Sequence, residues 1–222
     1  MSAVPPVMPP FDAPSVAPHD GAVDWAAVRA DFPLLLREVH GKPLIYLDNA
    51  NTGQKPMSVI EAVDGYYRRQ NANVSRAVHQ LGTEATEAYE GARGKLARFL
   101  NVRTDELVLC SGTTFAINLV AYSWALPRLG PGDTILVSRM EHHANIVPWQ
   151  QLAASKGATL RVIPVDDTGQ VRLDEYQKLL NDRTKIVAVT QVSNALGTVV
   201  PVKEIVAMAH RAGAKALVDG AQ

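Results

Sequence analysis

The sequence predicts a three-layer α/β fold built on a mainly parallel sheet, and two observations lead to this prediction. From residue 106 to residue 218, short apolar runs alternate with helix-length segments, as in strands joined by right-handed crossovers. The run 186–189 is apolar at every position, without the alternation of a strand that has one face in water. Such strands are buried on both faces, so helices should cover both sides of the sheet.

The first fifty residues predict a tail and two short elements. Residues 1–22 are rich in Pro and Ala and predict a disordered tail, with the folded domain over residues 23–222. Asp24 can cap a helix that runs to Phe32 and ends before Pro33. Residues 44–47 are predicted to form a strand.

Two helices and the regular alternation follow. Pro56 suits the first turn of a helix with apolar residues at helical spacing. A second helix is predicted over about residues 84–100, with Ala88, Ala92, Leu96 and Phe99 facing inward. Further strands are predicted at 106–110, 134–138, 159–163, 185–190 and 215–218, and further helices at 115–124, 146–156, 173–180 and 201–211.

Composition narrows the class of ligand. The 222 residues are 47% hydrophobic, and 22 basic side chains balance 22 acidic ones, so the charge favours neither nucleic acid nor an anionic membrane surface. No apolar run approaches the roughly 20 residues that span a bilayer. The single cysteine, Cys110, excludes an internal disulfide and is expected to be a buried small hydrophobe. We therefore expect a cytoplasmic protein with a small-molecule ligand.

Polar side chains follow four of the predicted strands. They are Ser111 to Thr114, Glu141 to Asn145, Gln191 to Asn194, and Asp219. Ligands of open α/β sheets bind beyond the carboxyl ends of the strands, so these clusters should meet at one edge. The sequence predicts a single site there.

The first cluster is predicted to bind a phosphate group. Ser111, Gly112, Thr113 and Thr114 lie between a strand and a helix, where free amide groups and two hydroxyls can surround an anion. By itself the segment would more often be a simple Ser/Thr cap. The sequence has neither a G-x-G-x-x-G loop nor a Walker loop, which favours a single phosphate monoester.

The other clusters predict a flat, nitrogen-containing ring. His142 or His143 could stack on a ring or carry protons, although an isolated His-His pair is more often a surface feature and a metal site is disfavoured. Asn194 could donate to a phenolate-like oxygen and Asp219 could hold a protonated ring nitrogen, with turn formation the alternative for each. Together with the phosphate cup, these groups describe pyridoxal 5'-phosphate (PLP).

Six blocks carry a family resemblance. The sequence resembles the class V, fold-type I PLP enzymes, and within them the cysteine desulfurases of the SUF type, from about Trp25 to the last residue. The blocks are 46–50, 54–56, 112–114, 140–149, 192–197 and 218–222.

The resemblance implies the fold and the role of each site residue. The chain would form the large domain of a PLP-dependent transferase, incomplete at its carboxyl end, and about residues 23–50 would belong to the small domain. His142 would stack on the ring, and Asp219 would pair with the ring nitrogen. By the same resemblance, Gly112, Thr113 and Thr114 would bind the phosphate, Asn194 and Gln222 the ring oxygen, and Asn49, Ala50 and Arg76 the substrate.

The resemblance also implies an activity. Family members convert L-cysteine to L-alanine as homodimers and pass the sulfur on as a persulfide, through an acceptor protein, to iron–sulfur cluster assembly. Their cofactor-binding lysine and persulfide cysteine lie beyond the block that ends at Gln222. The chain is therefore expected to be the amino-terminal part of such an enzyme and inactive alone.

Three departures keep alternatives open. Asn51, Ser75 and Phe115 stand where the family usually has Ala, His and Glu. A selenocysteine lyase, or an amino-acid lyase or epimerase of the same class, is the nearest alternative. A non-catalytic scaffold subunit is the alternative from another functional class.

Overall fold

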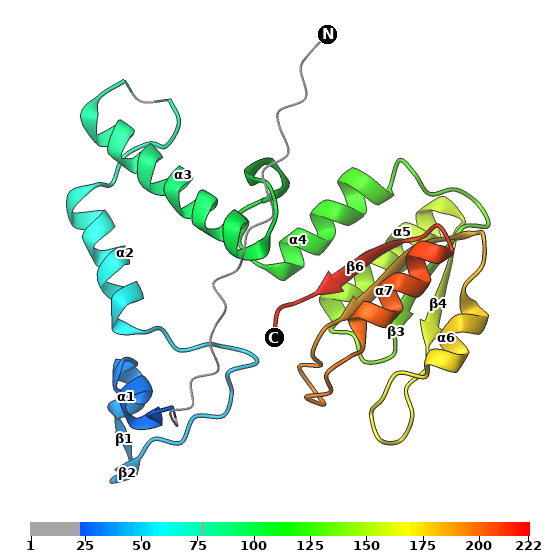
Figure 1. The fold of residues 1–222 in the computed structure, drawn as a ribbon, viewed down its shortest axis with the longest axis horizontal. Coiled ribbons are helices and arrows are strands. Elements are labelled where there is room, and N and C mark those ends of the chain that lie inside the picture. Colours follow the sequence, from blue (N-terminus) through cyan, green and yellow to red (C-terminus); the bar gives the residue numbers. More distant parts are fainter. Residues whose placement is uncertain (1–22, 77) are drawn as a thin grey trace. The chain divides into compact units, whose positions relative to one another are not determined.

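The computed structural model describes residues 23–76 and 78–222. The predicted tail, residues 1–22, lies outside the described residues. The chain divides into two compact units, the first ending at Leu109 and the second spanning Cys110–Gln222 (Figure 1). Within the described ranges, none of the helices combines the length and hydrophobicity needed to cross a lipid bilayer.

The first unit is helical apart from one small hairpin. Asp24 caps the first helix as predicted, because its Oδ1 accepts hydrogen bonds from the Ala26 and Ala27 amides, although the helix ends at Ala30 rather than Phe32. Pro56 caps the next long helix without being part of it. The elements are α1 (Trp25–Ala30), η1 (Pro33–Leu36), β1 (Glu38–Val39), β2 (Lys42–Pro43), α2 (Met57–Arg69), α3 (Gln80–Leu100) and η2 (Thr104–Glu106).

Two predicted strands are wrong. Residues 44–47 pair with no strand in the described chain, and Ile45 and Leu47 are 81% and 88% exposed. The strand predicted at 106–110 is also absent from the described structure, because Glu106 is drawn into η2, where its Oε2 accepts a hydrogen bond from the Arg103 amide. An apolar run becomes a strand only where a neighbour satisfies its backbone groups.

Two burial predictions are also wrong. The predicted inward stripe of α3 is exposed, Phe99 at 82%, and Ala85 and Ala97 are buried instead. The helix meets η2, and Arg93 donates to the backbone oxygens of Thr104 and Leu107, so this neighbour determines which face is covered. Cys110 is exposed, not buried.

The second unit confirms the three-layer prediction. Its parallel strands lie in the order β4-β3-β5-β6, with β3 and β5 in the centre. β3 and β4 have the predicted bounds, and the other elements agree to within two residues. They are α4 (Thr113–Leu119) continuing as the π-helix η3 (Val120–Ala125), β3 (Thr134–Ser138), η4 (His143–Asn145), α5 (Val147–Lys156), β4 (Thr159–Ile163), α6 (Leu173–Leu179), β5 (Thr184–Thr190), α7 (Val202–Arg211) and β6 (Lys215–Asp219).

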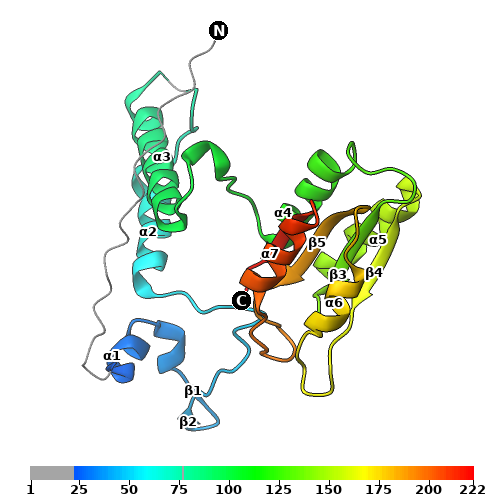
Figure 2. The same ribbon diagram turned by 45° about the vertical axis from the view of Figure 1, so that its right-hand side comes forward.

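Helices cover both faces of this sheet. Ile135 and Val137 of β3 pack with α4, η3 and α5 on one face, whereas Leu136 packs with α6 and α7 on the other. Figure 2 shows α6 and α7 together on their face of the sheet. The chain leaves β3 through α5 towards β4, and leaves β5 through α7 towards β6. These crossovers diverge on opposite faces, so a ligand crevice is expected at the carboxyl ends of β3 and β5.

Candidate functional site

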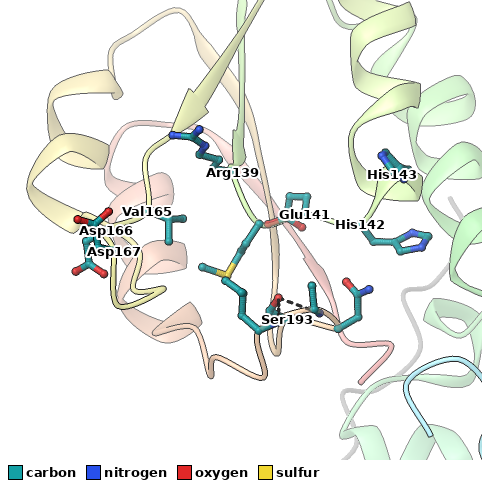
Figure 3. A pocket seen from close by; sticks show the side chains of 12 residues that line it. Arg139, Glu141, His142, His143, Val165, Asp166, Asp167 and Ser193 are labelled. Atoms are coloured by element: carbon teal, nitrogen blue, oxygen red, sulfur yellow. Dashed lines mark hydrogen bonds between the residues drawn. The ribbon is translucent and has the colours of Figure 1, made fainter. Parts of the chain in front are cut away.

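A cavity of about 570 Å³ lies at this switch point (Figure 3). The loops that follow β3, β4 and β5 line it. Its size suits a small molecule. Its lining consists of Arg139 to His143, Val165 to Asp167, and Ser193 to Leu196.

His142 lies in the cavity wall with a fixed ring orientation. Its Nδ1 accepts a hydrogen bond from the Ala144 amide at 3.1 Å and caps η4, so in the neutral ring the proton is on Nε2. The His143 ring lies edge-on to it, with centroids 6.1 Å apart and planes at 63°. The two rings thus differ in role, because only His142 is held by a backbone group.

Asn194 lines the same cavity and presents an uncommitted amide. The turn around it is held by Ser193, whose Oγ accepts hydrogen bonds from the Ala195 and Leu196 amides, and not by Asn194 itself. Within the described residues no side-chain hydrogen bond of Asn194 is found, and the side chain is exposed. Turn formation therefore does not explain this asparagine.

Glu141 belongs to a predicted polar cluster, but no role was predicted for it. Its carboxylate is 8% exposed and accepts three hydrogen bonds: from the Ser138 hydroxyl, from the Thr190 amide at 2.9 Å and from Asn145 Nδ2 at 2.7 Å. Asn145 in turn accepts from the Trp149 indole at 2.9 Å. The spacing of Glu141, Asn145 and Trp149, four residues apart, was the available sequence signal for this network. The contact with Thr190 had no such signal, because Thr190 is distant in sequence.

Burial sets the protonation of Glu141. Removal from water raises the pKa of its carboxyl above 4.5. The three hydrogen bonds that the carboxylate accepts lower the pKa, but burial has the larger effect. The like charge of Asp219 acts in the same direction as burial. The folded protein therefore holds this proton more tightly than the unfolded chain does.

The stability of the fold should consequently fall as pH rises above 4.5, through the folded-state pKa of Glu141. In that window the folded state binds more protons than the unfolded state, so one group contributes a slope of at most about 1.4 kcal/mol per pH unit. Urea unfolding at a series of pH values should show the slope in the wild type and a shallower one in Glu141→Gln. Glu204→Gln, which removes an exposed carboxylate, is the control. Parallel curves for wild type and Glu141→Gln would contradict the assignment.

Asp219 is buried at the carboxyl end of β6. It pairs in register with Thr190 of β5, and its Oδ1 accepts a hydrogen bond from the Ala221 amide at 3.0 Å. Turn formation thus accounts for one of its oxygens. Across the described part of the chain, neither Asp219 nor Glu141 forms an ion pair. The carboxyl-end edge of the sheet therefore holds two buried carboxyl groups without a cation, whereas the carboxylates of the ion pairs elsewhere in the described chain each have one.

The amide groups at the start of α4 are open to a ligand. Gly112 precedes the helix at φ 151°, a conformation that side chains with a Cβ rarely adopt, and no side chain caps this helix in the described structure. A Ser/Thr cap is therefore the wrong interpretation. The hydroxyls of Thr113 and Thr114 find no partner among the described residues. The helix packs against η4, directly after His142.

The predicted site residues are thus only partly brought together. His142 and Asn194 share the cavity, whereas Gly112, Thr113, Thr114, Asp219 and Gln222 do not line it. Gln222 is exposed, three residues beyond β6. Asn49, Ala50 and Arg76 belong to the first unit, and their assignment to substrate stays a prediction.

Known proteins resemble this chain in sequence. The profile of the family "Aminotransferase class-V" matches residues 45–222. A protein of Xylella fastidiosa (strain Temecula1) named "Probable cysteine desulfurase" is 62% identical over 199 residues, which are 90% of this chain and 48% of that protein. The chain spans about half the length of the curated relatives it matches.

Solved structures share the fold. The apo cysteine desulfurase of Thermococcus onnurineus NA1 superposes with a TM-score of 0.82 at 37% identity, over 90% of this chain and 48% of that one. A variant of the enzyme C-DES, solved with glycine covalently linked to its PLP cofactor, gives a TM-score of 0.72 at 25% identity, over 87% and 49% of the two chains. The similarity thus extends to a protein that holds PLP.

Proposed function

The chain belongs to the class-V aminotransferase family, and we propose that it binds pyridoxal 5'-phosphate at the carboxyl ends of β3, β5 and β6 and works as a cysteine desulfurase. The observation that carries the proposal is the pair of buried carboxyl groups, Glu141 and Asp219, with no cation partner in the described residues. A protonated ring nitrogen supplies the positive charge that such groups need.

The other residues fit the remaining parts of the cofactor. The Gly112 loop and the first amides of α4, with the Thr113 and Thr114 hydroxyls, offer donors to a phosphate. His142 offers a flat ring of fixed orientation, and Asn194 and Gln222 offer amide donors to a ring oxygen. Bound PLP would supply an electron sink for the chemistry at the substrate's α-carbon. Asp219 would keep the ring nitrogen protonated and so maintain that sink.

L-Cysteine is the proposed substrate, with Asn49, Ala50 and Arg76 as the groups that contact it. The names of the relatives support a cysteine desulfurase. We further propose that it releases L-alanine and passes the sulfur to an acceptor protein of the SUF iron–sulfur assembly pathway. We also propose a cytoplasmic homodimer. Exposed apolar side chains such as Ile45, Leu47 and Phe99 support association with a second polypeptide.

Titration of the purified protein with PLP tests the proposal. We expect saturable binding, which is monitored through the change in cofactor absorbance. Inorganic phosphate should compete with PLP and so weaken this binding. His142→Ala should weaken binding about fivefold, because the stacked ring contributes about 1 kcal/mol. His143→Ala is the matched control and should change the affinity less. Non-saturable binding, or a larger effect at His143 than at His142, would contradict the proposal.

A further inference from the structure

Glu141 is a buried carboxyl group that makes none of the proposed direct contacts to the cofactor. Every group that the structure places against its carboxylate can act as a donor: the Ser138 hydroxyl, the Thr190 amide and the Asn145 amide. Amide donors cannot accept a proton in return, so these contacts favour the ionised form of Glu141, whereas burial favours the protonated form. A buried carboxylate held this way is costly unless it serves a partner.

The same contacts place Glu141 close to Asp219. Glu141 follows β3, and its carboxylate accepts a hydrogen bond from the backbone amide of Thr190 at the end of β5. Thr190 is in turn paired in register with Asp219 on β6. Only the width of one strand thus separates the two carboxyl groups. The link through Asn145 to the fully buried Trp149 anchors Glu141 to α5 as well.

No nearby side chain neutralises this pair. Figure 3 shows the Arg139 side chain directed away from Glu141, and neither carboxyl group forms an ion pair within residues 23–76 and 78–222. A cation that enters the cavity is therefore attracted by two charges rather than one. The titratable and charged groups around Glu141 and the cavity are Arg139, His142 and His143 after β3, Asp166 and Asp167 after β4, and Asp219 at the end of β6.

From this geometry we infer that Glu141 is a positioning residue that acts through Asp219. In its ionised form, Glu141 adds a negative charge to that of Asp219 and helps to hold the proton on the ring nitrogen of bound PLP. The inference rests on the proposed function. It adds a second buried carboxylate, which lies just after β3, to the one at the end of β6 that controls this proton.

The pH titration of the ring nitrogen tests the inference. PLP labelled with ¹⁵N in the ring would be bound to the protein, and the ¹⁵N chemical shift followed against pH. Glu141→Gln should lower the pH at which the ring nitrogen loses its proton by about one unit, because a nearby negative charge is removed. Glu141→Asp, which keeps the charge, should titrate closer to the wild type.

Ser138→Ala is the matched control, because it removes a donor from the same network and leaves the charge in place. A purely structural role would shift the titration in Ser138→Ala as much as in Glu141→Gln, and would overturn the inference. Wild-type titration in Glu141→Gln would overturn it as well, with PLP binding intact. Absence of bound PLP in the wild type would overturn the proposed function and the inference together. If Glu141→Gln fails to fold, the ring nitrogen must lose its proton near the wild-type pH in both Glu141→Asp and Ser138→Ala. A similar shift of that pH in both variants would contradict a role for the charge of Glu141.

Discussion

Asp219→Ala is expected to reduce the formation of L-alanine from L-cysteine by the native protein about a thousandfold. Preorganised electrostatic contacts to a reacting group have effects of this size when they are removed. Asp219 lies at the carboxyl end of β6 and, within the described chain, has no competing cation. Without it the ring nitrogen of the cofactor would lose its charged partner, although the Gly112 loop would still be able to hold the phosphate. The measurement is the steady-state rate of alanine formation.

Asp167→Ala provides the control for that experiment. Asp167 is an exposed acid that lines the cavity after β4, and we give it no part in the chemistry. The Asp167→Ala enzyme should keep a rate within a few-fold of the wild type. An Asp219→Ala enzyme with a normal rate would remove Asp219 from the proposed role.

Trp149→Ala is expected to lower the free energy of unfolding by about 3–5 kcal/mol, the cost of truncating a large aromatic core residue. Trp149 is 0% exposed, packs with the helices on one face of the sheet and donates to Asn145 Oδ1. The substitution leaves a cavity and also frees an acceptor in the network that holds Glu141. Urea unfolding followed by circular dichroism measures the loss.

Two other variants separate these contributions. Trp149→Phe keeps most of the volume and leaves the Asn145 oxygen without its donor, so a loss of about 1–3 kcal/mol is expected. Trp25→Ala removes a tryptophan that is 72% exposed and should change the stability by less than about 0.5 kcal/mol. Equal losses for Trp149→Ala and Trp25→Ala would show that the indole network contributes nothing specific.

The central sheet could be predicted from sequence because its signals are local. The uninterrupted apolar runs of β3 and β5 are buried on both faces, and Gly157 in the left-handed region at the end of α5 separates that helix from β4. The run 44–47 shows the limit of the same signal. Its apolar character is as clear, but no strand in the described chain pairs with it, and pairing is not a property of the segment itself.

The site was predictable to the extent that it follows strand ends. His142 and Asn194 each lie four residues beyond a strand end, and Asp219 is the last residue of its strand, so the topology rule placed them at one edge of the sheet. No role was predicted for Glu141, because its importance depends on Thr190, which lies on a different strand and contacts it through a backbone amide. The amide carries no sequence signature, so only the folded structure identifies this contact.

A crystal structure of the native protein with bound PLP tests the central claim most directly. We expect the ring nitrogen within hydrogen-bond distance of the Asp219 carboxylate, the ring against His142, and the phosphate at the Gly112 loop and the start of α4. PLP bound elsewhere on the protein, or bound at this edge with its ring nitrogen away from Asp219, would contradict the account.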